Sequence, residues 1–282
     1  MRAFVQPSNE ETRPLQPFLR WAGGKRWLVK KENQIAPLQF DTYIEPFLGS
    51  AAVFFSISST NFIISDINAE LINCYMAIRN NHEEIEGLLR IHQAKHSKDY
   101  YYQIRESQPK TEQTKAARFL YLNRTCFNGL YRVNHQGKFN VPIGSKNNAL
   151  LDNDNFRSIA EKLKQGTVLH QDFEKTIELA EEGDFIFIDP PYTVNHNLNG
   201  FIAYNENIFS WEDQVRLKNS IVSAQSRGAM ITLTNADHES IHDLYSGLGN
   251  IQRLERNSVI AGKACHRKVT SEIIMRFGWG NK

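Results

Sequence analysis

The sequence predicts a doubly wound α/β domain interrupted by a basic, mostly helical insertion. Apolar, β-branched runs that are typical of buried strands recur at 42–47, 61–66, 167–172, 184–189 and 229–235. Helical patterns follow several of these runs, and strands that alternate with helices form parallel sheets. A long helical stretch over 81–148 separates the second strand from the third. We therefore expect one sheet assembled from two separated parts of the chain, 1–80 and 149–282.

The other elements follow from the same patterns. Gly49 and the small residues after it open an apolar helix that we expect from about Ala51. The segment INAELINCYMAIRN, after the second strand, carries apolar residues at helical spacing. The remaining elements are helices over about 174–181 and 211–226 and strands at 251–256 and 272–277.

Length and composition exclude several classes of protein. Of the 282 residues, 41% are hydrophobic and 23% are charged, which is ordinary globular usage and excludes collagen-like, coiled-coil and disordered chains. No run approaches the roughly 18 to 20 apolar residues of a membrane-spanning helix. Residues 1–11 lack the apolar stretch of a secretory signal. We expect a soluble, cytoplasmic protein with no membrane partner.

The cysteines and histidines do not predict a metal site. The cysteines lie far apart, at Cys74, Cys126 and Cys265, and form no C-x-x-C pair. His92 and His96 have helical i, i+4 spacing, but Gln93 stands where a zinc hydrolase would carry its glutamate base. We therefore expect reduced cysteines, no bound metal, and two histidines on the solvated face of a helix.

The charge distribution is more informative than the net charge of +2. Between Glu112 and Asp152 there is no acidic residue at all. Six positive charges lie in this interval, on Lys115, Arg118, Arg124, Arg132, Lys138 and Lys146. A local field of one sign with aromatic residues inside it is typical of polyanion binding. The alternative is a solvated loop that happens to be basic.

Carboxylates follow four of the expected strands, at Glu45, Asp66, Asp172 and Asp189. Ligands of doubly wound sheets bind outside the carboxyl ends of the strands, so these acids are placed to accept hydroxyl and amino donors. An acid after the second strand, here Asp66, suits the two hydroxyls of a ribose. The alternative for Asp66 or Asp172 is a helix N-cap, a position that favours aspartate.

Two phosphate-binding motifs are absent. The turn at 49–51 lacks the full G-x-G-x-x-G of a dinucleotide site. The segment AGGKRW resembles the end of a phosphate loop, but a Walker motif would need glycine at Leu19 and serine or threonine at Arg26. With both motifs absent, the ligand that we expect at the carboxyl ends of the strands contains a nucleoside but no phosphate chain.

The sharpest feature is the sequence Asp189-Pro190-Pro191-Tyr192 at the end of a buried strand. The two prolines fix φ and remove two backbone donors, so the loop presents unopposed carbonyl oxygens beside the carboxylate. This arrangement suits a planar ring that carries an NH₂ group. Asp189 and the Pro190 carbonyl would accept its two N–H bonds while Tyr192 stacks on its face. The alternative is a plain polyproline turn leaving a sheet.

Five motifs occur in one order: PFLRWAGGK (17–25), YIEPFLGSAAVFF (43–55), DIN (66–68), NRTCFNGLYRVN with GKFNVPIG (123–144), and DPPY (189–192). In this order the sequence resembles the DNA adenine-N6 methyltransferases of the Dam type, the alpha group of the D12 class. In that group cofactor motifs come first, a target recognition domain follows and the catalytic motif comes last. The resemblance implies a Rossmann-like class I methyltransferase sheet, with a target recognition domain containing a β-hairpin over 81–148.

The resemblance also implies S-adenosylmethionine as the cofactor. The residues that it assigns to cofactor binding are Trp21, Lys25, Gly49, Asp66, Asp172 and Asp189. Gly49 would lie close to the methionine portion, Asp66 at the ribose and Asp172 at the adenine. Asp189 would serve both the cofactor side and the target base. The one departure is Ala51, where relatives usually place a second glycine.

Adenine N6 cannot be reached inside a stacked duplex, so the target base must be flipped out. The Asn128-Gly129 pair favours a tight turn that places Phe127 at a loop tip, as a wedge for the vacated stack. The alternative is that Phe127 is a core residue. Arg132 suits bidentate contact with guanine. The residues that we expect at the DNA are Arg124, Phe127, Asn128, Arg132, Pro142 and Lys146. Further phosphate contacts are expected from Arg253, Arg256, Lys263, Arg267 and Lys268.

We therefore predict an enzyme that methylates N6 of a flipped adenine in double-stranded DNA, with Asp189, Pro190 and Tyr192 as catalytic residues. GATC is the leading recognition sequence. An N4-cytosine methyltransferase is the chemical alternative, because that amine is electronically similar. A DNA-binding regulator that has kept a cofactor pocket is the non-enzymatic alternative. We expect a monomer and leave open whether a cognate restriction endonuclease exists.

Overall fold

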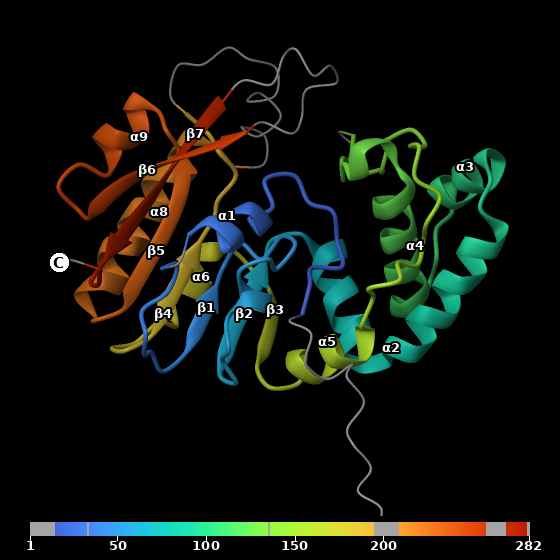
Figure 1. The fold of residues 1–282 in the computed structure, drawn as a ribbon, viewed down its shortest axis with the longest axis horizontal. Coiled ribbons are helices and arrows are strands. Elements are labelled where there is room, and N and C mark those ends of the chain that lie inside the picture. The colour runs from blue at the N-terminus through green and yellow to red at the C-terminus, as the bar shows by residue number, and fades with distance from the viewer. Residues whose placement is uncertain (1–14, 33, 135, 195–208, 258–268, 281–282) are drawn as a thin grey trace, which may run out of the picture.

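The computed structural model describes residues 15–32, 34–134, 136–194, 209–257 and 269–280. Within them, the central sheet has the strand order β3-β2-β1-β4-β5-β7-β6 (Figure 1). The strands are β1 (Tyr43–Glu45), β2 (Phe62–Asp66), β3 (Thr167–His170), β4 (Phe185–Ile188), β5 (Met230–Ala236), β6 (Asn250–Asn257) and β7 (Val269–Phe277). Strands β1 to β5 run parallel, and β7 is antiparallel to β5 and β6. The predicted Rossmann-like α/β fold is confirmed.

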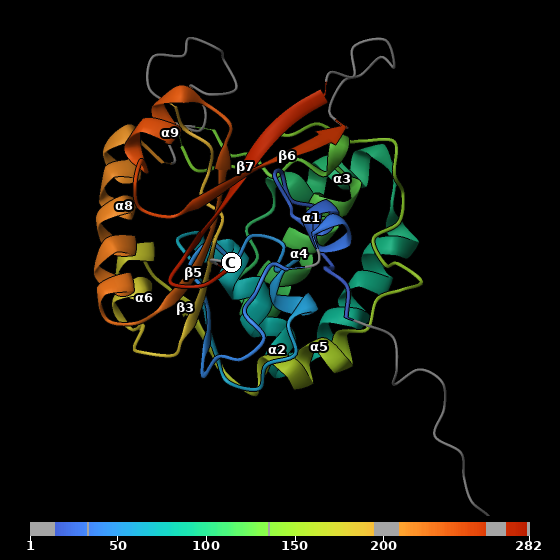
Figure 2. The same ribbon diagram turned by 60° about the vertical axis from the view of Figure 1, so that its left-hand side comes forward.

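The sheet separates two layers of helices. Figure 2 shows the helices α6 (Phe173–Glu178), α8 (Trp211–Ser226) and α9 (Glu239–Leu244) on one side, and α1 (Arg26–Lys31) and α5 (Phe156–Leu163) on the other. The side chains of β4 alternate between these layers. Phe185 and Phe187 belong to the core cluster that contains α5. Ile186 and Ile188 belong to the cluster beneath α8. Both faces of the sheet are therefore buried, which explains the continuous apolar runs of its parallel strands.

The insertion is built on a long helix that starts beside the sheet. The helix α2 (Ala69–Lys95) is capped by the Asn68 side chain and has one non-helical residue, Asn81, at φ −145° and ψ 45°. The α-helices α3 (Lys98–Glu106) and α4 (Glu112–Thr125) follow in the insertion, and α4 packs against α2. Figure 1 shows all three helices beyond the β3 edge of the sheet. The expected boundary at residue 81 falls on an interruption within a helix that continues through it.

A short hairpin follows α4 and the 3₁₀ helix η2 (Phe127–Gly129). Val133 forms an antiparallel bridge with Phe139. The Asn134 N–H donates to the Lys138 carbonyl at 2.9 Å, which closes the turn. The predicted β-hairpin is present as this narrow antiparallel pairing rather than as two full strands.

The turn after β1 leads into a 3₁₀ helix instead of the α-helix expected from Ala51. Gly49 and Ala51 have left-handed backbone conformations, with φ of +48° and +57°. A left-handed residue cannot continue a right-handed helix. The Ala51 N–H donates to the Leu48 carbonyl at 2.7 Å, and the 3₁₀ helix η1 (Phe54–Ser56) follows. Residues 51–55 are all buried, so their apolar run reflects burial rather than helical periodicity.

His92 and His96 are half-buried in the insertion rather than solvated, which corrects the prediction. His92 Nδ1 lies 2.9 Å from the Tyr100 hydroxyl, and His96 Nδ1 lies 2.8 Å from the Tyr121 hydroxyl. Burial lowers the pKa of His92 to about 4, so its ring is neutral at pH 7.

The described residues also test three simpler expectations. They contain no cluster of His, Cys, Asp or Glu side chains that could hold a metal ion. Cys74 and Cys126 are buried free thiols, whereas Cys265 lies outside the described residues. None of the helices in this part of the chain is both long and apolar enough to cross a bilayer.

Arg124, which the basic stretch suggested as a DNA contact, is a buried structural residue. Its side chain is 0% exposed. The guanidinium donates to both carboxylate oxygens of Asp154, at 2.6 and 2.7 Å, and to the carbonyls of Phe18 and Ala149. The prediction is wrong for this residue because its charge joins α4 to two other segments inside the protein. Counting charges along the sequence does not separate buried from exposed cations.

We expect Arg124→Met to lower the free energy of unfolding by about 3 to 5 kcal/mol, because it leaves Asp154 buried without its partner. Urea-induced unfolding followed by circular dichroism measures the change. Arg157→Met is the matched control, since the pair of Arg157 with Glu161 is exposed and should contribute less than about 0.5 kcal/mol. Equal losses in the two variants would contradict the structural role of Arg124.

Candidate active site

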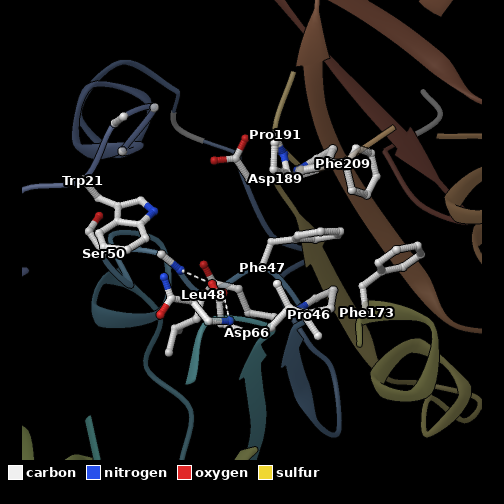
Figure 3. Close-up of a pocket in the computed structure, with 18 of the residues that line it drawn as sticks. Trp21, Pro46, Phe47, Leu48, Ser50, Asp66, Phe173, Asp189, Pro191 and Phe209 are labelled. Carbon is white, nitrogen blue, oxygen red and sulfur yellow. Dashed lines mark hydrogen bonds between the residues drawn. The ribbon is translucent and has the colours of Figure 1, made fainter. Parts of the chain in front are cut away.

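A cavity of about 630 Å³ lies at the carboxyl ends of β1, β2 and β4. Its lining comes from the segment before α1, from the edge of the sheet and from the insertion, which contributes Tyr131. Figure 3 shows Asp189 and Asp66 facing this space from different sides, with Trp21 on a third. The four strand-end carboxylates all line the cavity: Glu45, Asp66, Asp172 and Asp189.

Asp189 follows β4 with one carboxylate oxygen held by two donors. Oδ1 accepts the Thr234 hydroxyl at 2.7 Å and lies 2.8 Å from Lys25 Nζ. Burial raises the pKa of Asp189, and the charge of Lys25 opposes this rise. Pro190 and Pro191, which also line the cavity, fix the backbone after the carboxylate. The wall of the cavity therefore carries a carboxylate followed by two residues that have no backbone N–H donor.

Lys25 and Tyr192 join the same buried cluster through Glu272. Lys25 Nζ lies 3.5 Å from Glu272 Oε2 and donates to the Gly23 carbonyl at 3.0 Å. The Tyr192 hydroxyl donates to Glu272 Oε2 at 2.7 Å. Burial raises the pKa of Tyr192 well above its ordinary value, so the hydroxyl stays protonated. Glu272 was not predicted from the sequence. The sequence feature that could have indicated it is the position of this acid next to the apolar residues of β7.

Glu45, at the end of β1, is a buried carboxylate beside this cluster. Its Oε2 accepts the Tyr43 hydroxyl at 2.7 Å. Burial raises the pKa of Glu45 well above its ordinary value, and the hydrogen bond from Tyr43 opposes the rise. A neutral or weakly ionised Glu45 can lie close to Asp189 at little electrostatic cost.

Asp66 shapes the turn that follows β1. Its Oδ2 accepts the Gly49 N–H at 3.1 Å, and its Oδ1 accepts the Asn68 N–H at 2.9 Å. Because the side chain of Asn68 caps α2, the helix-cap alternative does not apply to Asp66. Each carboxylate oxygen keeps a further lone pair, so Asp66 can accept hydroxyl donors from the cavity.

Trp21 lies between the Gly49 turn and the insertion. A Cβ atom on Gly49 would stand only 2.9 Å from Trp21 Cδ1, so the indole requires a glycine at this turn. On its other side the indole stacks on Tyr131, with ring centroids 5.5 Å apart and an interplanar angle of 19°. Tyr131 was not predicted as a cavity residue, because the sequence does not reveal which ring meets the indole.

Asp172 is a helix cap that also forms an ion pair. Its Oδ1 accepts the Glu174 N–H at the start of α6, so the N-cap alternative is correct for this residue. Arg216, from α8, donates to both of its oxygens at 3.1 and 3.0 Å. Arg216 lines the cavity and was not predicted from the sequence, because its partner belongs to a different helix.

Comparison with known families decides between the chemical alternatives. The family model of the D12 class N6 adenine-specific DNA methyltransferases matches residues 21–260. The chain belongs to this family. The enzyme is therefore an adenine-specific DNA methyltransferase, and both the N4-cytosine enzyme and the non-enzymatic regulator are set aside.

Two curated relatives of the methyltransferase cover nearly its whole length. A type II methyltransferase of Lactococcus lactis subsp. cremoris is 37% identical over 94% of this chain and 96% of its own. A DNA adenine methylase of Haemophilus influenzae is 33% identical over 98% of this chain and 99% of its own. Among solved structures, a precorrin 8W decarboxylase of Methanobacterium thermoautotrophicum aligns with 98% of this chain and 100% of that one, at 11% identity and a TM-score of 0.39.

The segment after α4, residues 127–134 and 136–146, is the tip of the insertion. It carries the remaining predicted DNA contacts of the methyltransferase. Phe127 is 55% exposed, so the alternative of a core residue is wrong. Asn128 has a left-handed backbone, with φ of +57°, in the expected tight turn. Arg132 is half-buried, and its Nε donates to Asn140 at 3.0 Å. Two further predicted contacts are exposed near this tip, Pro142 and Lys146.

The C-terminal cations are only partly described. Arg253 is exposed and lies 2.7 Å from Asp237, so part of its charge is neutralised within the protein. The side chain of Arg256 lies outside the description, as do all atoms of Lys263, Arg267 and Lys268.

We expect Lys25→Met to make the methyltransferase less stable as the pH rises. Without the ammonium, the carboxylate of Asp189 is buried beside Glu272 with no cation between them, so the folded-state pKa of Asp189 rises further above its unfolded value near 4. The unfolded chain then binds fewer protons than the folded one, and stability falls as the pH increases through this interval. Thermal unfolding between about pH 4.5 and pH 7.5 measures the slope.

The control for this change is Lys30→Met, which removes an exposed charge from α1, the helix that begins directly after Lys25. Its melting temperature should follow the wild-type dependence on pH. A Lys25→Met variant whose melting temperature also follows that dependence would show that the ammonium does not neutralise the buried acids.

Proposed function

We propose that this methyltransferase transfers the methyl group of S-adenosylmethionine to the N6 amine of an adenine flipped out of double-stranded DNA, within GATC. The observation that carries the proposal is the acceptor loop Asp189-Pro190-Pro191-Tyr192 on the wall of a cavity of about 630 Å³. The volume lies within the usual range of ligand sites. The same cavity contains a second polar wall at Asp66 and Gly49, which suits a nucleoside-bearing donor.

The residues of the cavity fit S-adenosylmethionine. This cofactor supplies, when bound, a methyl group on a positively charged sulfur. The cavity lining contains six acidic side chains and two basic ones, Lys25 and Arg216, and an excess of acid favours a cationic ligand. We assign Gly49 and Trp21 to its methionine end, and Asp66 to its ribose hydroxyls. Lys25 and Asp172 complete the proposed binding set, with Asp172 held by Arg216 at the adenine end.

The acceptor loop addresses the weakness of the adenine amine as a nucleophile. The lone pair of this nitrogen is delocalised into the ring. Hydrogen bonds from the amine to Asp189 and to the Pro190 carbonyl favour a more tetrahedral nitrogen, whose lone pair points away from the ring. Tyr192 stacks on the base and fixes its plane. The chain thus contributes position and fixed dipoles, without a covalent enzyme intermediate.

The tip of the insertion supplies the proposed DNA contacts. The exposed Phe127 is an apolar wedge that can fill the space left by the flipped base, at a cost of a few kcal/mol for unstacking. Arg132 reads guanine, and Asn128 and Pro142 approach the bases. Lys146 contacts the backbone. Arg253 and the C-terminal cations add phosphate contacts, which makes binding steeply dependent on salt.

We further propose that the enzyme acts as a monomer and is cytoplasmic. The Lactococcus relative is named a type II methyltransferase and the Haemophilus relative a DNA adenine methylase. Two alternatives therefore remain for this chain, that it acts together with a cognate restriction endonuclease or without one.

The proposal is tested by expressing the chain in a host without adenine methylation, sequencing the modified bases and digesting the DNA to nucleosides. We expect N6-methyladenine confined to GATC. Methylation of a different site would refute the sequence assignment alone. Unmodified DNA, or methylated cytosine, would refute the reaction.

We expect Asp189→Ala to lower kcat by at least about 10² to 10³, because it removes a placed acceptor of the reacting amine. Transfer of tritium from labelled S-adenosylmethionine to duplex DNA measures the loss. Asp152→Ala, at an exposed position, is the control and should keep wild-type activity. If Asp189→Ala retained more than about a tenth of the activity, its proposed role would be wrong.

We expect Gly49→Ala to raise the dissociation constant of S-adenosylmethionine about tenfold, since the new methyl group pushes Trp21 from its place. Isothermal titration calorimetry measures the affinity. Gly247→Ala is the control, because Gly247 also has a positive φ, +74°, but nothing within 4 Å of the added Cβ. Equal affinities in the two variants would mean that the indole does not border the cofactor.

We expect Arg132→Ala to relax the preference for one base pair of the site, at about 1 to 3 kcal/mol of lost discrimination. Methylation of duplexes that each carry one substituted base pair measures this preference. Lys146→Ala, the comparison variant, should weaken all duplexes alike and reduce the salt dependence by about one ion. An unchanged ranking of duplexes with Arg132→Ala would exclude base reading by this side chain.

A further inference from the structure

Glu272 is buried against the acceptor loop, although it belongs to the last strand of the sheet. It is 5% exposed and lies on β7, where it pairs with Ala236 of β5 and Leu254 of β6. Its Oε2 accepts the Tyr192 hydroxyl at 2.7 Å and lies 3.5 Å from Lys25 Nζ. Burying a carboxylate costs desolvation free energy, and hydrophobic packing alone does not require a carboxylate at this position.

Lys25 connects this carboxylate to Asp189. Its ammonium donates to the Gly23 carbonyl at 3.0 Å and forms ion pairs with Asp189 Oδ1 at 2.8 Å and with Glu272 Oε2 at 3.5 Å. The ammonium also stands 4.8 Å from the centre of the Tyr192 ring. One cation is therefore shared between two carboxylates and packs on the ring beside them.

The contacts of Asp189 fall on one of its two oxygens. Both Lys25 and the Thr234 hydroxyl, 2.7 Å away, bind Oδ1. Within the described part of the chain, Oδ2 keeps its lone pairs for a ligand in the cavity. The cluster thus fixes the orientation of the carboxylate and leaves one oxygen for the substrate amine.

We propose that Glu272 is a positioning residue for methyl transfer, which shares the ammonium of Lys25 with Asp189 and fixes the ring of Tyr192 through its hydroxyl. The inference rests on the proposed roles of Asp189 and Tyr192. Because the ammonium of Lys25 pairs with Glu272 as well as with Asp189, Asp189 remains a stronger hydrogen-bond acceptor than it would be if Lys25 paired with it alone. By accepting from Tyr192, it holds the ring in the plane that the flipped base requires.

The charged and titratable groups around Asp189 set the sign of the test. Lys25 faces it from the start of α1, Glu272 from β7, Glu45 from the end of β1 and Tyr192 from its own loop. Lys25 lowers the pKa of Asp189, whereas Glu272 raises it. Removing the charge of Glu272 should therefore lower this pKa and move the loss of activity at acidic pH to lower pH.

The test is single-turnover methylation of duplex DNA by Glu272→Gln between about pH 5 and pH 8.5, beside the wild type. Glutamine keeps the size of the side chain and an acceptor for Tyr192, but it removes the negative charge that pairs with Lys25. We expect kcat to fall between about 10-fold and 100-fold, with KM for both substrates nearly unchanged, because the reacting groups are misplaced rather than lost. The acidic limb of the profile should move to lower pH.

Glu255→Gln is the matched control, because it removes an exposed acid from the neighbouring strand β6. It should reproduce the wild-type rate and profile. A folded Glu272→Gln variant with the wild-type kcat overturns the proposal. A variant with a lower kcat but an unmoved acidic limb also overturns it, since loss of structure alone would lower the rate without shifting the profile.

Tyr192→Phe keeps the inference testable if Glu272→Gln does not fold. This change keeps the ring and the charge of Glu272 but removes the hydroxyl that joins them. Because the charge of Glu272 remains in this variant, the acidic limb should not move, and we expect a lower kcat with KM for both substrates nearly unchanged. A wild-type kcat, or a raised KM for either substrate, would overturn the positioning role. Failure of the proposed function itself is recognised separately, because the wild-type enzyme would then leave adenine in duplex DNA unmethylated.

Discussion

One buried ammonium, that of Lys25, allows carboxylates from opposite parts of the sheet to face a single cavity. It lies 2.8 Å from Asp189 and 3.5 Å from Glu272, and burial raises the pKa of Asp189 even in its presence. Charged groups of one sign cannot be buried together without such a partner. The segment before α1, which precedes all the strands of the described residues, is therefore part of the site.

Much of the fold could be predicted because buried parallel strands read as continuous apolar runs. The run at 184–189 and the observed strand Phe185–Ile188 differ by one residue at each end. The errors arise where the same residue types serve another purpose. The apolar run after Gly49 is buried on all sides and turns through a left-handed Ala51, and the charge of Arg124 is consumed in a buried pair. Neither periodicity nor charge counting carries that information.

The candidate site also contains residues that could be predicted from the sequence and residues that could not. Asp66 and Asp189 could be predicted to line it because Asp66 ends β2 and Asp189 directly follows β4, and parallel strands bring their carboxyl ends to one edge. Glu272 and Tyr131 could not, because tertiary packing brings them there: Glu272 by the antiparallel register of β7, and Tyr131 by the docking of the hairpin onto Trp21. The predicted contacts at Lys263, Arg267 and Lys268 lie outside the described residues.

The stack of Trp21 on Tyr131 limits how freely specificity can be exchanged between such enzymes. Tyr131 belongs to the segment expected to read DNA, yet its ring forms part of the cavity wall and its hydroxyl donates to Glu70 in the first turn of α2. A chimera that received a foreign reading module would lose this wall unless the transplanted ring matched the indole. If the loop tip reads DNA as proposed, the inserted segment and the N-terminal segment must match each other, and substitutions at the tip change specificity at less structural cost than exchange of the whole insertion.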